Sequence, residues 1–191
     1  MSVVQNNTIS TNSITEATSA NGVSIDGLKV KDYSLMYGSN TGLTVSSDGY
    51  VTKPNHPAFA AYKDDNAADP NNYTTPIAFD HTFFNQGNHY ATTGGNAGKF
   101  TCPVTGIYHF YTTVLSSDSA GVFRVAILLN GNKKSGEIRL IDSDYEFASV
   151  SATISCATND LVYVNFHNTN SDIALHGDAT PYLTFGGFLI G

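Results

Sequence analysis

The chain has 191 residues, of which 41% are hydrophobic and only 13% are charged, and its formal net charge is −7 at pH 7. Nine Lys and Arg residues, with one dense spot at Lys133-Lys134, are too few for a phosphate-binding surface, which excludes a nucleic-acid-binding protein. No run of about 18 apolar residues exists to span a membrane. Because charge is scarce, Asn, Thr, Ser and Gly must cover the surface, as is common in proteins built from strands and tight turns.

Residues 1–56 differ in character from the rest of the chain. Their opening, 6–21, is dominated by Asn, Thr and Ser and holds too few apolar residues to bury a core alone. Short alternating segments at 23–26, 28–31 and 43–46 follow, punctuated by glycines, and predict brief strands joined by turns. Such strands are too short to be stable in an isolated monomer, so we expect other copies of the chain or another protein to cover them.

From Pro57 onward the hydrophobic pattern strengthens. Asn130-Gly131 directly follows an apolar run and predicts a tight hairpin turn of type I′. Aromatic and β-branched residues at period two, in strands at this spacing, indicate an all-β sandwich. The segments predicted as strands are 59–62, 77–84, 99–115, 122–129, 137–140, 145–155, 161–167, 173–176 and 182–190.

A spaced pattern of aromatic, Asn and Gly residues runs through the first half of this region. Its members are Phe79, Asn85, Tyr90, Phe100, Gly106, Tyr108 and Phe110. By this pattern, and by its closing segment 182–190, the chain from about residue 57 onward resembles the globular head of complement component one, subcomponent q, and the tumour-necrosis-factor-like jelly rolls. Nine residues rather than six separate Tyr90 from Phe100, and Thr112 stands where the last aromatic is usual. A Gly-rich surface loop tolerates such an insertion.

This resemblance implies an all-β, ten-stranded jelly-roll head over residues 57–191, preceded by a short β-rich anchor in residues 1–56. Heads of the family pack in threes through flat aromatic and apolar faces, an interface on the order of 2,000 Å² or more, so we expect a homotrimer. The aromatic residues expected in the core or the trimer interface are Phe79, Tyr90, Phe100, Tyr108, Phe110, Phe185 and Phe188.

Residues 14–28 and 43–54 are similar to stretches that precede such heads in bacteriophage structural proteins. No basic segment followed by an apolar stretch opens the chain, so no secretory signal is visible. Both observations fit a virion surface protein that assembles in the host cytoplasm and is released by lysis. We expect residues 1–56 to bind a major capsid or tail protein.

Within that hypothesis, the short anchor favours capsid decoration, because a free-standing fibre usually needs a longer shaft. A trimer also suits a local threefold of a capsid lattice. A tail-fibre tip that binds a host glycan or receptor is the alternative. A free soluble cytokine-like or lectin-like binding module is the second hypothesis, and an enzyme is the least favoured.

Neither catalysis nor a cofactor is expected. The sequence contains no Gly-x-Ser-x-Gly, no phosphate-binding glycine loop and no His-Glu-x-x-His. Asp142, Asp144 and Glu146 recur at every second position and would share a strand face, which indicates a solvated acidic edge, with calcium as the alternative. The histidines considered, none at metal-ligand spacing, are His81, His89, His109, His167 and His176.

Recognition is expected in loops, because function on a rigid β scaffold usually lies there. The long polar segments 64–75 and 89–98 are the best candidates. Cys102 and Cys156 stand in apolar alternating surroundings, so buried free thiols are favoured over a bridge between strands. The residues singled out as candidate recognition residues are Asp64, Asp65, Asp69, His89 and Asn96.

Overall fold

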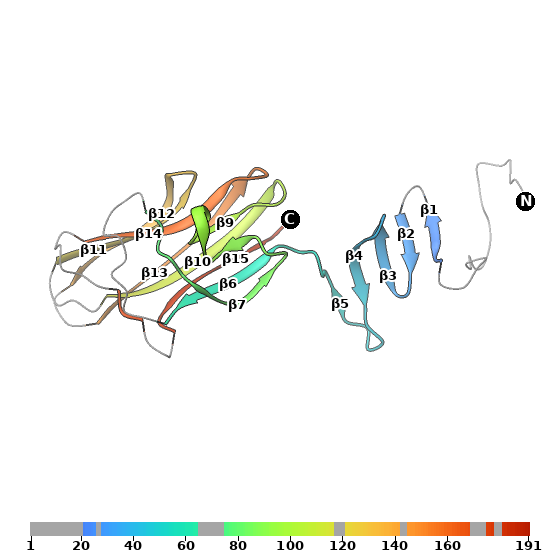
Figure 1. Cartoon of the computed structure of the whole chain (residues 1–191), viewed down its shortest axis with the longest axis horizontal. Helices are drawn as coiled ribbons and strands as arrows, with labels where there is room; N and C mark the ends of the chain where they lie inside the picture. Colours follow the sequence, from blue (N-terminus) through green and yellow to red (C-terminus); the bar gives the residue numbers. More distant parts are fainter. Residues whose placement is uncertain are drawn as a thin grey trace, which may run out of the picture. The chain divides into compact units, whose positions relative to one another are not determined.

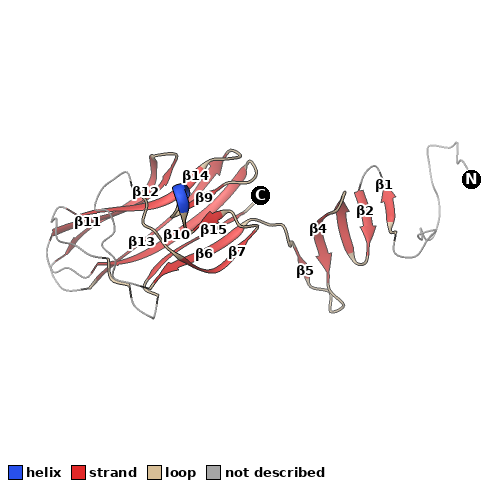
Figure 2. Cartoon of the chain, in the orientation of Figure 1, coloured by secondary structure: helices blue, strands red, loops and turns tan. Residues whose placement is uncertain are grey.

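The computed structural model describes residues 21–25, 28–64, 75–116, 121–141, 145–168, 175–177 and 181–191. The chain divides into two compact units, residues 1–55 and 56–191, here called the N-terminal unit and the head. This division lies one residue before the boundary expected from the sequence. Both units are built of strands, and a short 3-10 helix, Gly94–Asn96, lies in the head (Figure 2). No helix among the described residues is long and apolar enough to cross a membrane.

The N-terminal unit is one antiparallel sheet whose five strands follow each other in chain order (Figure 1). The sequence predicted the first, second and fourth of these strands. It missed the third, where three apolar residues in succession hide the alternation, and the fifth, which has only two residues. The strands are β1 (Val23–Ile25), β2 (Leu28–Lys31), β3 (Ser34–Tyr37), β4 (Asn40–Val45) and β5 (Val51–Thr52).

The head is a sandwich of two five-stranded antiparallel sheets (Figure 1). The front sheet has the order β13-β10-β15-β6-β7 and the back sheet the order β12-β11-β14-β9-β8. Each sheet pairs consecutive strands, such as β11 with β12, and also strands distant in the sequence, such as β6 with β15 and β9 with β14, as in a jelly roll. The strands are β6 (Ala58–Lys63), β7 (His81–Gln86), β8 (Tyr90–Ala91), β9 (Lys99–Thr101), β10 (Gly106–Ser116), β11 (Gly121–Leu129), β12 (Asn132–Ile141), β13 (Glu146–Cys156), β14 (Leu161–Asn168) and β15 (Leu183–Leu189).

One predicted strand, 99–115, is two strands in different sheets. The chain leaves the ladder after Thr101 and re-enters at Gly106, so β9 belongs to the back sheet and β10 to the front sheet. Pro103 lies in this crossing, and proline has no N–H to continue a ladder. The prediction of one continuous strand was wrong because alternation continues through the crossing and does not reveal a change of sheet.

Aromatic rings fill the space between the two sheets. Phe59 lies at the centre, stacked on Tyr90 and Phe100 with ring centroids 4.9 and 4.8 Å away, and it meets Phe185 edge-on at 4.9 Å. Such ring contacts add stabilisation beyond the burial of apolar area. The fully buried aromatic side chains include Phe59, Phe79, Phe100, Tyr108, Phe110 and Phe185.

Phe188 is the exception among the aromatic residues assigned to a sandwich core. It is 42% exposed and lies on the outward face of the front sheet. Phe188 follows Phe185 by three residues, and successive side chains of a strand point to opposite faces, so the two rings cannot both point inward. Of the two places expected for Phe188, the core and the trimer interface, its exposure excludes the core.

The turn between β11 and β12 has the predicted form. Asn130 and Gly131 both have positive φ, 49° and 84°, which confirms the tight turn inferred from the Asn-Gly pair. The Asn130 side chain also donates a hydrogen bond of 2.7 Å to Asp160 and accepts one of 2.9 Å from the Leu161 N–H. The N–H of Ala157 and the Asn130 amide lower the pKa of Asp160. The two neighbouring turns are thus hydrogen-bonded to each other.

Candidate functional site

The outward face of the front sheet is aromatic and uncharged. Alternation on the four strands β13, β10, β15 and β6 places neutral residues on this face, with no Asp, Glu, Lys or Arg among those the structure describes. Large apolar side chains are exposed there, although an isolated soluble head gains nothing by exposing them. We call this surface the aromatic face; its exposed large residues are Ile107, Tyr111, Phe147 and Phe188.

Two adjacent glycines of β15 allow aromatic rings to lie against both sides of that strand. A Cβ atom on Gly186 would lie 2.4 Å from ring atoms of Tyr111, on the outward side. One on Gly187 would lie 2.3 Å from Phe110, on the core side. Both distances are too short for real contacts, so the glycines are needed for the rings to pack flat. The Gly-Gly pair between two phenylalanines is the sequence signal for this arrangement.

The β13 side of the aromatic face is lined with hydroxyl groups. His109 lies on this face, as its alternation with Tyr108 and Phe110 predicts, and its Nδ1 is 3.1 Å from Thr153 Oγ1. The His109 ring is 5.7 Å from that of Phe188. Hydroxyl groups form hydrogen bonds without carrying a charge, so this side of the face can meet another surface without burying an unpaired ion.

The opposite margin of the front sheet extends the aromatic surface. Tyr62 of β6 stacks on Phe83 and His81 of β7, with ring centroids 4.5 and 5.2 Å apart. Phe83 and Phe84 are 59% and 51% exposed. Because β7 is an edge strand, these rings stand where a neighbouring molecule would have direct access to them.

A pocket lies at one end of the front sheet. We call this end, opposite Ala58, the distal end; β6 ends there at Lys63 and β10 at Ser116. Tyr145, His176 and Tyr182 contact one another through their rings, with centroids 4.9 and 6.0 Å apart. The pocket has a volume of about 290 Å³ and is lined by Leu115, Tyr145, Phe147, His176 and Tyr182.

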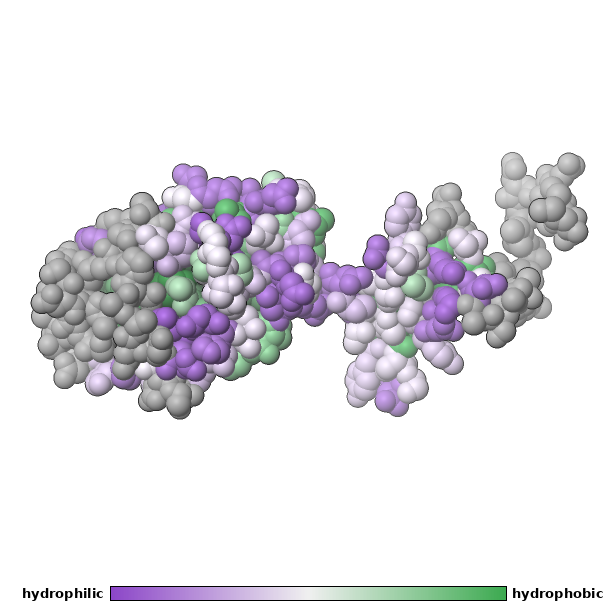
Figure 3. Space-filling view, in the orientation of Figure 1, coloured by the Kyte–Doolittle hydropathy of each residue, from purple (hydrophilic) through white to green (hydrophobic). Residues whose placement is uncertain are grey.

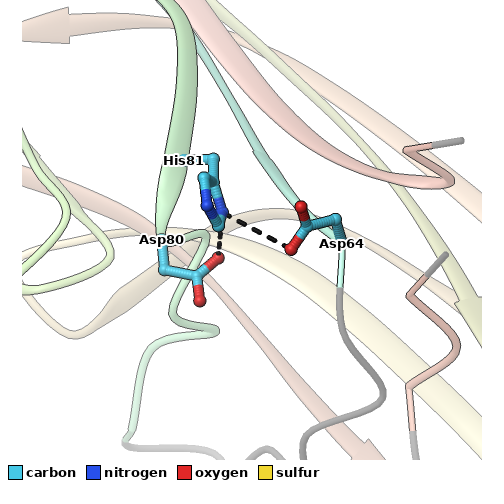
Figure 4. Close-up of side chains that lie close together, drawn as sticks. All are labelled: Asp64, Asp80 and His81. Carbon is cyan, nitrogen blue, oxygen red and sulfur yellow. Dashed lines mark hydrogen bonds and ion pairs between the residues drawn. The ribbon is translucent and has the colours of Figure 1, made fainter. Parts of the chain in front are cut away.

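Two carboxylates and an imidazole also meet at the distal end (Figure 4). His81 Nδ1 is 3.0 Å from an oxygen of Asp80 and 3.6 Å from one of Asp64. Nitrogen and oxygen ligands of this kind can hold a divalent cation. However, all three side chains are exposed, and Lys63 Nζ lies 3.9 Å from the second oxygen of Asp80, where it offsets part of the negative charge.

The candidate recognition residues are not gathered at one place. Asp64 lies in the distal cluster, whereas Asn96 is exposed in the 3-10 helix. His89 is half-buried with its ring edge-on to Phe100, and this burial lowers its pKa, so its side chain offers little to a partner. Four of the acidic residues considered lie outside the described residues: Asp65, Asp69, Asp142 and Asp144.

Several residues of the distal end were missed from the sequence. Asp80 and His81 are adjacent in the chain, at the start of β7, and this Asp-His pair was the available signal. Tyr145 and Tyr182 were assigned to strands, and nothing in the alternation shows that the ends of two distant strands share a pocket. The pocket forms because the order of strands in the sheet brings these distant strand ends together.

The two cysteines are buried and free. Burial and the adjacent Cys156 thiol raise the pKa of Cys102, and burial raises the pKa of Cys156. A thiol that stays protonated at neutral pH is a poor nucleophile. Both cysteines therefore act as small apolar core residues, the interpretation favoured from the sequence.

The fold and the uncharged aromatic face define a class of protein, the jelly-roll binding heads of the complement and tumour-necrosis-factor type. The sequence profile of the C1q domain matches residues 58–190, and the chain belongs to this family. The match begins at the head, so the N-terminal unit lies outside it.

Two curated relatives match this chain over part of their own length. The chain is 31% identical to Caprin-2 of Danio rerio over 140 residues, which is 70% of this chain and 14% of Caprin-2. It is 32% identical to the human complement C1q and tumor necrosis factor-related protein 9A over 117 residues, 60% of this chain and 33% of that protein. The match therefore spans a third or less of these relatives.

A solved structure supports the same fold. Murine APRIL, crystallised at pH 5.0, matches with a TM-score of 0.56 and 15% identity, covering 71% of this chain and 99% of that chain. Domains of these families are generally non-enzymatic binding modules that self-assemble into trimers. The resemblance of the head to this family, stated from its sequence pattern, is confirmed.

Proposed function

We propose that the protein is a non-enzymatic binding module that works as a homotrimer, with three heads packed through the aromatic face. The observation that carries the proposal is that face itself, on which Ile107, Tyr111, Phe147 and Phe188 are exposed in the absence of any charged side chain. Contiguous apolar surface on a soluble domain marks an interaction site. A threefold arrangement covers the same surface on every copy.

The proposal places recognition at the distal end. The pocket shares Phe147 with the aromatic face, so it opens at the border of the packed surface, and it lies at the same end of the sheet as the Asp64, Asp80 and His81 cluster. Aromatic rings beside hydrogen-bonding carboxylates suit a polar ligand with an apolar face, such as a sugar. A host-surface glycan is the ligand class that we propose.

In its finer form the proposal is a bacteriophage virion surface protein that decorates the capsid through residues 1–56. One feature supports it, the likeness of residues 14–28 and 43–54 to stretches that precede such heads in phage proteins. A tail-fibre tip and a free-standing binding module are the alternatives.

The homotrimer is tested by measuring the mass of the full chain by light scattering during size-exclusion chromatography. The expected value is three times the chain mass of 20.4 kDa. Phe188→Asp places a charge on the aromatic face and is expected to give monomers. Ile138→Asp is the matched control, because Ile138 is 61% exposed on β12 of the back sheet, and it is expected to remain trimeric. A monomeric wild-type chain, or dissociation by both variants equally, would refute the aromatic-face trimer.

The virion role is tested separately by mass spectrometry of purified phage particles. The chain is expected in stoichiometric amounts in the particle and to be lost from it when residues 1–55 are deleted. Recovery only as a free trimer in the lysate would favour the free-standing module.

The distal end is tested by measuring binding of the trimer to a glycan array. We expect Tyr182→Ala to weaken binding and Ile138→Ala to leave it unchanged.

A further inference from the structure

The N-terminal sheet has one apolar face and one polar face. Strand pairing places Val30 opposite Val23 on one side and Leu35 on the other, and Leu35 opposite Leu43. Side chains directly opposite each other on paired strands share a face of the sheet. The apolar face includes Val23, Leu28, Val30, Leu35, Tyr37 and Leu43, with Asn40 opposite Tyr37, and the polar face includes Ser24, Lys29, Lys31, Ser34, Met36 and Thr44.

The apolar face is the more exposed of the two. Leu28, Val30 and Tyr37 are 49%, 57% and 71% exposed, whereas Lys29 and Lys31 are half-buried. A sheet with one apolar face needs a second layer to cover it. Among the residues of this unit whose burial the structure describes, none is buried, so residues 28–55 do not cover this face themselves. Figure 3 shows hydrophobic residues at the surface of this otherwise hydrophilic unit.

We infer that two further copies of the same sheet supply the missing layer, so that three apolar faces pack together and form a second trimerisation interface. The inference rests on the proposed homotrimer of heads. Five residues, 53–57, separate Thr52 from Ala58, so each sheet is tethered to its own head by a span of at most about 20 Å. Tethers this short raise the effective concentration of the three sheets to the millimolar range.

The charges of the unit favour this face over the other. None of the side chains named on the apolar face is charged, so three copies can meet there without burying an ion. Lys31 is paired with Asp32, but meeting through the polar face would still bring together Lys29 from all three copies, and like charges in an interface are unfavourable. The apolar face is thus suited to pack against itself.

The first experiment is cysteine cross-linking in the full chain, run beside a mass measurement on the same sample. Leu35→Cys and Val30→Cys each place a thiol on the apolar face, and Lys29→Cys is the matched control on the polar face. The chain's own Cys102 and Cys156 are buried and do not interfere. With a short bismaleimide cross-linker, we expect covalent dimers from both apolar-face variants and at most a tenth of that yield from Lys29→Cys.

The two measurements separate failure of this inference from failure of the proposed function. A trimeric mass with no cross-linking at residues 30 and 35, or with equal yield at residue 29, overturns the second interface and leaves the homotrimer of heads standing. A monomeric mass overturns the homotrimer and the inference with it.

Hydrogen exchange of the free trimer is the second test. We expect amides of β2, β3 and β4 to exchange at least tenfold faster in Leu35→Asp than in the wild type, and Ser34→Asp, on the polar face, to leave them unchanged. Head amides serve as the internal reference. If these strands become protected only after purified virions are added, another protein covers the face, and the inference is overturned.

Discussion

The head and the N-terminal unit use the same local structure, short antiparallel strands with alternating side chains, but differ in what covers them. In the head, the inward faces of two sheets meet, and rings such as Phe59, Phe110 and Phe185 are at most 1% exposed. In the N-terminal unit one sheet stands without a second layer, and Val30 is 57% exposed. Stability of a sheet therefore comes from the layer packed on it, not from its alternation.

The largest expected difference between the two units follows from deleting one apolar side chain in each. Phe59→Ala removes a ring in contact with four other rings and should lower the free energy of unfolding of the head by about 3–5 kcal/mol. Leu35→Ala, in the N-terminal sheet, should change head unfolding by less than about 0.5 kcal/mol. Urea denaturation followed by tyrosine fluorescence, at one fixed protein concentration, measures both. Equal losses would show that the two units unfold as one.

Replacing one glycine by alanine in each unit should give the next largest difference in stability. Gly187→Ala would place a methyl group 2.3 Å from the Phe110 ring and should cost about 1–3 kcal/mol through overpacking. Gly42→Ala in β4 would meet only Leu35 O, at the ordinary contact distance of 3.6 Å. Thermal unfolding should therefore show a lower melting temperature for the first variant and no change for the second. A tolerated Gly187→Ala would mean that Phe110 has room to move.

Removing a tyrosine hydroxyl should have a smaller effect. The Tyr90 hydroxyl donates a hydrogen bond of 2.9 Å to the Phe79 carbonyl within the core, so Tyr90→Phe leaves a buried acceptor and should cost about 1–2 kcal/mol. Tyr50→Phe, at a side chain 72% exposed in the N-terminal unit and outside its strands, should be neutral. Denaturant unfolding of the two variants checks this, and a neutral Tyr90→Phe would imply that water replaces the bond.

The smallest expected effect is a pH dependence confined to the head. Burial lowers the pKa of His89 below its ordinary value of 6.5, so the unfolded chain binds a proton more readily than the folded head. The contribution that neutral His89 makes to the stability of the head is fully present above pH 6.5 and is lost as the pH falls through 6.5 toward the lowered pKa. Head unfolding measured at about pH 8 and about pH 5 should show a drop that His89→Gln reduces. The N-terminal unit contains no histidine and should not contribute.

Much of the head was accessible from local patterns. The Asn130-Gly131 turn and the buried faces of β10 and β11 follow from backbone preferences and alternation, which short segments encode by themselves. The prediction failed where a pattern continued across a change of partner, as in residues 99–115, which belong to two sheets. Sequence period reports which side of a strand is apolar and does not report which strand lies beside it.

The same limit explains the distal end. Asp64, Asp80 and His81 come together because β6 and β7 pair with Tyr62 opposite His81, and no local signal encodes that register. The pocket beside Tyr145 and Tyr182 likewise joins residues more than thirty positions apart.

The sequence by itself determined that the chain is β-rich, poor in charge, and divided near Pro57 into a weakly and a strongly hydrophobic part, because composition and alternation are local properties. Only the tertiary structure decided which face each aromatic residue occupies. Phe185 is buried and Phe188 exposed because the pairing of β15 with β10 and β6 sets which side of the strand meets the other sheet. Register and strand order depend on contacts between distant segments, and those contacts create both the aromatic face and the distal end.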